Sequence, residues 1–408
     1  MDNENNNTST SSSSNVSATI ADAIKKYRPS FGGSSGGDSD GIKKMLIGVI
    51  VLTLIVVILL LILSKASSTS TKKGVSYSDV EDAMTDSAKR FFKDNNKYLP
   101  KSNGGTVEIS AQKLINENYL SAHNTISSCT GKVVVQNNDD NYIYVPYLDC
   151  GSKYKTTELY RKVTNSSNIV SSGSGLYNDN GTYIFRGDTV NNYVQIGKVI
   201  WRIVKVTNDN LVELVRDSRS DSSMTFESYP WDDRLNVDKD FNSGINNFEL
   251  SRIKDTLDDS LSITDDYEQI VPKDFRGHLV ATSYCIGKRG ESDSTRNMST
   301  ECSQQSSPMK VGLLTVSEFM DASLDGNCNS TFAELCENYN YLNMADYDWW
   351  TITGDSANSY QVYYVESKGS VVVTNASSYK KLRPVIYLDS KTMFKSGKGT
   401  LEKPYKIK

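Results

Sequence analysis

The chain has 408 residues and a formal net charge of −4, with 45 Lys and Arg residues against 49 Asp and Glu residues. This balance excludes the basic surface that nucleic-acid binding requires, so we expect no nucleic-acid partner. Only 2 histidines are present, which argues against a zinc site. The length allows two or three domains.

A segment without charged residues lies near the N-terminus. Residues Met45–Leu63 read MLIGVIVLTLIVVILLLIL, and Thr53 is their only polar side chain. A helix over this segment is about 28 Å long, close to the hydrocarbon thickness of a bilayer. We therefore predict one transmembrane helix, Met45–Leu63, through which the chain is anchored in the membrane. The alternative, a cleaved secretory signal, is disfavoured by the long N-terminal extension.

The flanks of this segment predict its orientation. More Lys and Arg residues precede it than follow it, which predicts a cytoplasmic N-terminus and extracellular C-terminal domains. Residues 1–41 are rich in Asn, Ser, Thr and Gly and predict a disordered cytoplasmic tail. Residues 64–76 are rich in Ser, Thr and Lys and predict a flexible spacer.

A first folded module is predicted over residues 77–155. It opens with a helix, because Ser78 and Glu81 match the capping box S-x-x-E and apolar residues then recur at helical spacing up to about Asn96. An extended piece at Thr106–Ile109 and a second helix at Ala111–Asn118 follow. A hairpin is then predicted from the strands Lys132–Gln136 and Tyr142–Tyr147.

Three stretches of this module carry a resemblance. They read AKRFFKDNNKYLP, ISAQKLINENYLS and YVPYLDCG. Their order resembles the small α+β module, with a pilin- or pseudopilin-like layout, of surface proteins from Gram-positive-type bacteria. True pilins carry a Gly-Phe processing site and a Glu early in the apolar helix, whereas the apolar segment here has no Glu and is followed by a Ser/Thr-rich spacer. We therefore expect a module of this shape without processing or polymerisation into a pilus.

Residues 156–180 are rich in Ser, Asn and Gly, a composition that predicts a linker or a loop. The last module, residues 181–408, opens with strands at Thr182–Arg186, Val199–Val206 and Leu211–Arg216. Both faces of Val199–Val206 carry apolar side chains, so this strand is expected at the centre of a sheet. The next elements predicted are a helix at Phe248–Leu261, a short strand at Val311–Leu314 and a short helix that Ser317 could cap. They are followed by a segment with two tryptophans at Tyr341–Thr353, a hairpin of Gln361–Glu366 and Ser370–Thr374, and a closing strand at Arg383–Leu388.

This last module carries a second resemblance. The stretches GTYIFRGDTVNNYVQIGKVIWRIVKV, VGLLTVSEFMDA, WWTITGDS, VYYVESKGSVVV and LRPVIYL stand in the order seen in uncharacterised bacterial surface domains. Those domains are similar to the C-type-lectin-like fold shared with formylglycine-generating enzymes. The resemblance implies a compact α+β domain with long loops for ligand binding. The predicted fold class is therefore α+β, with one N-terminal transmembrane helix, a pilin-like module and a C-type-lectin-like domain.

All six cysteines follow the apolar segment, which suits an oxidising exterior. Neighbours in sequence bracket local loops, so we predict the structural disulfides Cys129–Cys150, Cys285–Cys302 and Cys328–Cys336. The first would close a loop worth roughly 3 kcal/mol of stability. A metal or redox role of the later pairs is the alternative, since copper-dependent formylglycine-generating enzymes use paired cysteines late in the chain.

Acidic clusters raise the question of calcium. They are Asp232, Asp233, Asp238 and Asp240, and Asp258, Asp259, Asp265 and Asp266. None matches an EF-hand loop, so a solvated surface is the favoured interpretation. We predict no metal, no cofactor and no catalytic residue. His123 and His278 are the only histidines that a Ser/His/Asp triad would have as its base.

Aromatic residues and one arginine of the last module are the predicted ligand contacts, because aromatic faces stack on sugars and pair with cations. They are Trp349, Trp350, Tyr363, Tyr364 and Arg383. For the two tryptophans, the favoured alternative is that both belong to the core of the lectin-like fold. Alternation along a strand sends Trp349 and Trp350 to opposite faces, so at most one is expected at the surface. The leading hypothesis is a single-pass cell-surface protein that binds a glycan or protein ligand or mediates adhesion. The alternatives are a structural part of a surface or secretion apparatus and, more distantly, an enzyme resembling the formylglycine-generating group.

Overall fold

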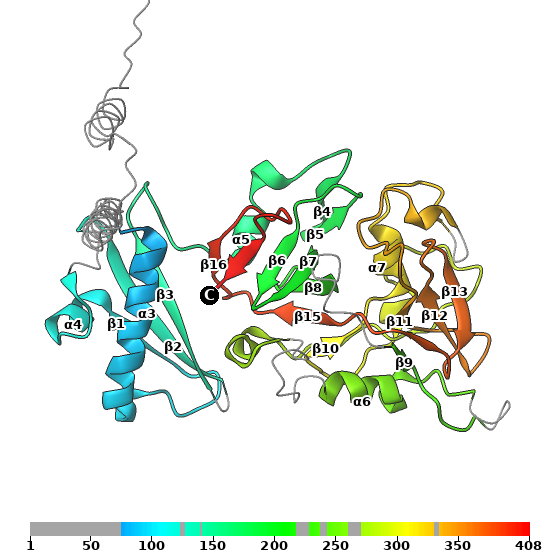
Figure 1. Ribbon diagram of the computed structural model, residues 1–408, viewed down its shortest axis with the longest axis horizontal. Coiled ribbons are helices and arrows are strands. Elements are labelled where there is room, and N and C mark those ends of the chain that lie inside the picture. Colours follow the sequence, from blue (N-terminus) through cyan, green and yellow to red (C-terminus); the bar gives the residue numbers. More distant parts are fainter. Residues whose placement is uncertain are drawn as a thin grey trace, which may run out of the picture. The chain divides into compact units, whose positions relative to one another are not determined.

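The computed structural model describes residues 75–122, 127–138, 141–217, 228–236, 243–259, 271–329 and 334–408. Val75–Lys408 form one compact unit with two separate hydrophobic cores. The fold is α+β and consists mostly of sheet, with a few short helices (Figure 1).

The predicted transmembrane helix over Met45–Leu63 lies outside the described residues, as does the predicted cytoplasmic tail. No helix in the described ranges is long and apolar enough to cross a membrane. The predicted fold class is therefore corrected to α+β for the described residues, which give no support to its transmembrane part. The longest helix described, α3 (Tyr77–Asp94), keeps a polar face that includes Asp86 and Arg90.

The first core lies between α3 and a three-stranded antiparallel sheet of order β1-β2-β3 (Figure 1). The strands are β1 (Thr106–Ser110), β2 (Thr130–Asn138) and β3 (Asn141–Asp149), and the helices besides α3 are the short η1 (Asn96–Tyr98) and α4 (Ala111–Asn116). The apolar residues predicted on α3 supply most of its buried face: Val80, Met84, Ala88, Phe91 and Phe92. Helix and hairpin thus lie where the sequence pattern predicted them.

The predicted capping box is wrong by two residues. Ser76 caps α3 and Asp79 completes the box, whereas the predicted partner Glu81 is buried. The Glu81 carboxylate accepts hydrogen bonds from the hydroxyls of Tyr154 (3.0 Å) and Thr156 and from the ammonium of Lys408. A buried carboxylate requires such hydrogen-bond partners. Glu81 therefore belongs to a buried hydrogen-bond network and does not cap the helix.

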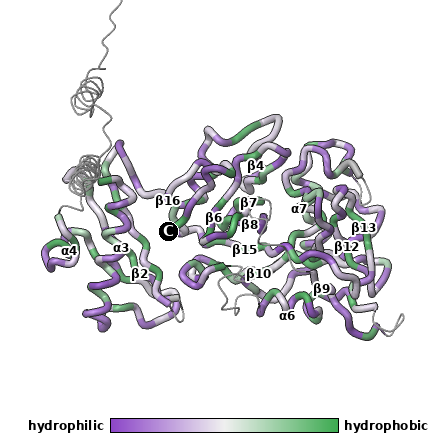
Figure 2. The backbone as a smooth tube through the Cα atoms, viewed as in Figure 1, coloured by the Kyte–Doolittle hydropathy of each residue, from purple (hydrophilic) through white to green (hydrophobic). Residues whose placement is uncertain are grey.

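The second sheet has the order β10-β15-β8-β7-β6-β17-β16, and β5 pairs with both β4 and β7. Strand β7 (Val199–Val206) is buried along nearly its whole length, as predicted for a central strand. Figure 2 shows hydrophobic residues gathered on β7 and β8. The other strands are β4 (Gly175–Asp179), β5 (Thr182–Arg186), β6 (Tyr193–Ile196), β8 (Val212–Asp217), β10 (Val311–Gly312), β15 (Val385–Leu388), β16 (Phe394–Ser396) and β17 (Tyr405–Ile407).

The third sheet has five strands in the order β13-β12-β11-β14-β9. The strands are β9 (Ser228–Pro230), β11 (Trp349–Gly354), β12 (Gln361–Val365), β13 (Val371–Asn375) and β14 (Tyr379–Lys381). The helices that accompany the second and third sheets are α5 (Leu159–Val163), η3 (Ser166–Asn168), η4 (Phe248–Leu250), α6 (Arg252–Asp259), η5 (Lys273–His278), η6 (Glu301–Ser303), α7 (Val316–Asp321) and η7 (Glu334–Glu337).

Residues 156–180 are not a linker. They contain α5 and β4, and Leu159, Val163 and Leu176 belong to the second core. Strand β4 pairs with β5 through the turn Asn180–Gly181, where both residues have positive φ, as a two-residue hairpin turn requires.

Two predicted helices begin elsewhere. Ser251 is extended and separates η4 from α6, so the helix predicted from Phe248 begins only at Arg252, and Leu250 is exposed. Helix α7 is capped by Thr315, with Glu318 closing the capping box, and Ser317 is free to bond elsewhere.

Candidate functional site

The residues predicted to contact a ligand lie in the core. Trp349 and Trp350 on β11, Tyr363 on β12 and Arg383 have no exposed surface, and Tyr364 is 8% exposed. Strand β11 is central in its sheet and buried at all six positions, so alternation brings neither tryptophan to the surface. We therefore correct these five residues from ligand contacts to core residues.

Their contacts are structural. Trp349 packs edge-on against Phe319, and the Arg383 guanidinium lies 5.0 Å from its ring centroid. Arg383 donates hydrogen bonds to the carbonyls of Arg216 (3.0 Å) and Leu342 (2.7 Å). Such an arginine joins chain segments through their backbone and has little left to offer a ligand.

All three predicted disulfides are present. Cys129 is bonded to Cys150, Cys285 to Cys302 and Cys328 to Cys336, and no cysteine in the described chain is free. Three such bonds indicate an oxidising, extracellular environment for this part of the chain.

The acidic clusters pair with cations where the structure describes them. Asp232 accepts hydrogen bonds from Arg234, Asp233 lies 2.8 Å from Arg252, and Asp258 lies 3.0 Å from Lys254. The described residues contain no group of three or more His, Cys, Asp or Glu side chains placed to hold a metal ion. Asp259 lies at the end of α6, whereas Asp238, Asp240, Asp265 and Asp266 lie outside the described residues.

His278 is the histidine that the described residues contain, and it lies in the interior. His278 is buried in η5, and burial lowers its pKa to about 4. Its Nδ1 is 3.4 Å from the hydroxyl of Thr392. His123 lies outside the described residues.

The site with most to offer a ligand is a pocket between β5, β7 and α7, which we call the β7–α7 pocket. Its volume is about 540 Å³, within the usual range for small-molecule sites. The pocket is lined by the β4–β5 turn, β5, β7, the turn after β7, the loop at 296–302, α7 with its C-terminal end, and Tyr341. The polar residues that line it are Asp179, Asn180, Thr182, Lys205, Thr207, Asn208, Arg296, Asn297, Glu318 and Asp321.

A buried ion cluster lies under this pocket. The ammonium of Lys205 on β7 donates to Glu318 Oε1 (2.5 Å), lies 2.9 Å from Glu213 Oε2 and touches the sulfur of Met298 at 3.3 Å. A bulge at Val204 shifts the register of β7, so Lys205 stands directly opposite Glu213 on β8. Glu318 reaches the same ammonium from α7, so the cluster connects two strands and a helix.

Burial and mutual repulsion shape the ionisation of this cluster. Burial and the Glu318 charge raise the pKa of Glu213 to about 8, against the opposing effect of Lys205. Burial also acts on Glu318, but Lys205 outweighs it and holds the pKa of Glu318 below its ordinary value. One carboxylate is thus firmly ionised, while the other binds a proton near neutral pH.

This arrangement predicts that stability falls as the pH rises. The folded protein binds the Glu213 proton more tightly than the unfolded chain, whose ordinary pKa is 4.5, so the stabilisation is full at low pH and is lost as the pH rises towards about 8. We expect the free energy of unfolding to fall by about 1 kcal/mol or more between pH 6 and pH 9. Urea unfolding at both pH values measures it.

The control for this pH dependence is Glu213→Gln, which removes the proton-binding group but keeps its size. The variant is expected to lose most of the slope, whereas Glu108→Gln, at an exposed pair with Lys132, keeps it. Equal slopes in the wild type and Glu213→Gln would contradict the assignment.

Two arginines hold the segments around the pocket in place. Arg186 donates to both carboxylate oxygens of Asp321, each at 2.9 Å, and so fixes the end of α7 to β5. Arg296 donates to the carbonyls of Met320 (2.6 Å), Asp325 (3.3 Å) and Ser323 beyond the same helix end. Both guanidinium groups are engaged in contacts within the protein, and these contacts hold the end of α7 and the 296–302 loop in place around the pocket.

The mouth of the pocket carries amides and hydroxyls. Asn208 Oδ1 accepts a hydrogen bond from Thr182 (3.1 Å), and Asn297 Oδ1 accepts one from the backbone of Ser299 (3.1 Å). In both residues the oxygen is engaged, which orients the amide nitrogen as a donor. A β-carbon on Gly181 would lie 2.9 Å from Asn208 Oδ1, so glycine permits the two turns to approach.

The sequence pattern did not identify this pocket. The feature of the sequence that could have indicated the pocket is Lys205 in the apolar strand VIWRIVKV, since a charged residue on a buried strand requires a partner of opposite charge. The partners come from Glu213 and from a helix more than a hundred residues away, which no local pattern reports.

Comparison with known proteins gives no match to a family model, a curated protein or a solved structure. The pilin-like and C-type-lectin-like resemblances therefore stay predictions.

Proposed function

We propose that this protein binds an extracellular ligand in the β7–α7 pocket and that the ligand is a saccharide. The observation that supports this is the composition of the pocket: amides and hydroxyls at its mouth and an ion cluster beneath it. Planar amide and carboxylate groups offer the paired donors and acceptors that neighbouring sugar hydroxyls require. The pocket is also large enough for one or two sugar rings.

The ordered walls favour binding over a purely structural role. A ligand gains affinity when the groups that receive it are already held in place. Here Arg186, Arg296 and the Cys285–Cys302 disulfide hold the surrounding segments before any ligand arrives. The alternative of a formylglycine-generating-like enzyme has less support, because Cys328 and Cys336 are joined in a disulfide.

A glycan array probed with the purified protein tests this proposal. Asn208→Ala is expected to weaken the best-bound glycan about three- to tenfold, because it removes one neutral hydrogen bond. Calorimetric titration of that glycan measures the change.

The matched control is Asn116→Ala, which removes an exposed asparagine from α4, outside the pocket. It is expected to bind like the wild type. Absence of binding to any glycan, or equal loss in both variants, would reject the β7–α7 pocket as a saccharide site.

A further inference from the structure

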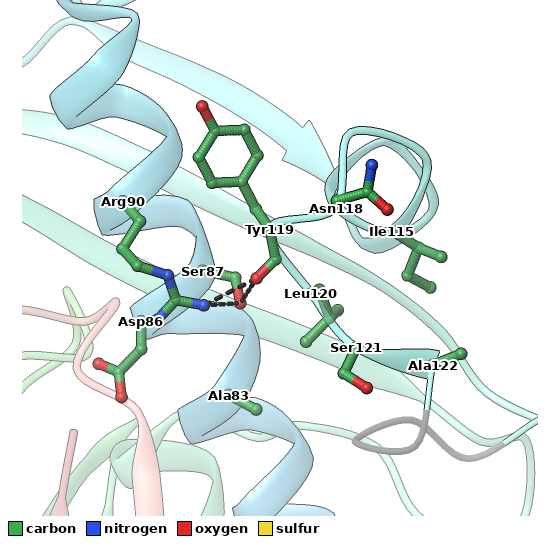
Figure 3. Close-up of a pocket in the computed structure, with 10 residues that line it drawn as sticks. All are labelled: Ala83, Asp86, Ser87, Arg90, Ile115, Asn118, Tyr119, Leu120, Ser121 and Ala122. Carbon is green, nitrogen blue, oxygen red and sulfur yellow. Dashed lines mark hydrogen bonds between the residues drawn. The ribbon is translucent and has the colours of Figure 1, made fainter.

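A second cavity lies in the first module, along one face of α3 (Figure 3). Its volume is about 820 Å³. One wall is formed by Ala83, Asp86, Ser87 and Arg90, which follow one another at helical spacing, and the other by the segment from Ile115 to Ala122. We call it the α3 groove.

The floor of the groove is small and apolar. Leu120 is buried, and Ala83 and Ile115 are half-buried. The Ser87 hydroxyl donates to the carbonyl of Tyr119 at 2.9 Å, so the polar atoms at the bottom are already satisfied. A segment lying in this groove would therefore meet apolar contacts below it.

Charged groups without ion-pair partners stand at the rim. Arg90 uses a single nitrogen, Nη2, for its contacts with Ser87 Oγ (3.0 Å) and the Tyr119 carbonyl (2.7 Å). No ion pair in the described residues includes Arg90 or Asp86, although they lie one helical turn apart. Figure 3 shows the Asp86 carboxylate turned away from the guanidinium.

These contacts point to a specific partner chemistry. The Tyr119 carbonyl and Ser87 both accept from Nη2 and hold the guanidinium in one orientation, which leaves its Nε–H and Nη1–H groups to donate a charge-assisted hydrogen bond to a carboxylate. We propose that the α3 groove binds an extended peptide of a partner protein, with a Glu or Asp side chain on Arg90 and apolar residues on the floor. This inference is independent of the saccharide proposal, since the groove and the β7–α7 pocket belong to different cores.

An array of acetylated hexapeptides tests the proposal. Each peptide has Glu at its third position and varied apolar residues at the fourth and fifth, and a twin array has Gln in place of Glu. The purified full chain is expected to select Glu peptides over their Gln twins by about tenfold, because a hydrogen bond between two charged groups is stronger than one to a neutral amide. Fluorescence anisotropy with the best pair measures the ratio.

Variants of α3 decide which residue causes the preference. Arg90→Met is expected to abolish the preference for Glu, and Arg90→Lys to retain part of it. Lys93→Met removes an exposed cation from the last turn of the same helix and is expected to leave the preference unchanged. Ala83→Trp fills the groove and is expected to abolish binding of both peptides.

Three results would overturn the proposal: no peptide bound on either array, equal binding of the Glu and Gln twins, or an unchanged preference in Arg90→Met. Circular dichroism of each variant verifies the fold. Because Arg90 is exposed, its replacement leaves the core intact.

Discussion

Replacement of Lys205 by methionine is expected to lower the free energy of unfolding by about 3–5 kcal/mol. The methionine leaves Glu213 and Glu318 in the core with no cation between them. Removing one member of a buried ion pair costs more than the pair contributes, because the remaining charge loses its compensation. Thermal unfolding followed by circular dichroism is expected to show a midpoint about 5–10 °C lower.

Two further variants separate charge from shape at this cluster. The triple change Lys205→Met, Glu213→Leu and Glu318→Gln removes every charge and keeps a capping side chain at position 318, so most of the loss should be recovered. Lys113→Met breaks an exposed pair with Glu117 and is expected to cost less than about 1 kcal/mol. A triple variant less stable than Lys205→Met would show that the cluster stabilises through its own attraction.

At this cluster the sequence predicts the strands but not the contact between Lys205 and α7. Strands β5 and β7 begin and end at the predicted residues, because alternation and a doubly apolar strand are local properties. The partner of Lys205 on α7 is set by how the helix packs on the sheet. No spacing in the sequence contains that information.

The errors at helix starts have a common cause. Ser76–Asp79 and Ser78–Glu81 both match a capping box, and the choice between them depends on which carboxylate is buried. Likewise Thr315 caps α7 because Ser317 donates to Glu301 at 2.7 Å. Local signals propose several starts, and tertiary contacts select one.

Composition misled the prediction at residues 156–180. Ser, Asn and Gly richness is typical of linkers, yet Asn180–Gly181 is a hairpin signal that marks β4 as a strand. The ligand contacts were misplaced for a related reason. Aromatic residues suit both a binding face and a core, and only the neighbours of β11 decide that Trp349 and Trp350 belong to the core.

Replacement of Arg289 by methionine is expected to loosen the disulfide-closed loop between Cys285 and Cys302. Arg289 is fully buried and donates to Ser317 Oγ (2.8 Å), to Glu301 (3.2 Å) and to the carbonyls of Asp293 and Thr295. Its loss leaves the Glu301 carboxylate buried without a cation, at a cost of about 3–5 kcal/mol. Limited trypsin digestion is expected to cut faster at Arg296, which lies on the same loop.

The digestion result distinguishes a local from a global effect. Cleavage at Arg296 leaves the two pieces joined by the Cys285–Cys302 bond, so the product separates on a gel only after reduction. Arg252→Met, at an exposed pair with Asp233, should be cut like the wild type. Because Arg296 and Asn297 line the β7–α7 pocket, faster cutting should be accompanied by weaker ligand binding. An unchanged rate at Arg296 in Arg289→Met would mean that the disulfide alone holds this wall of the pocket.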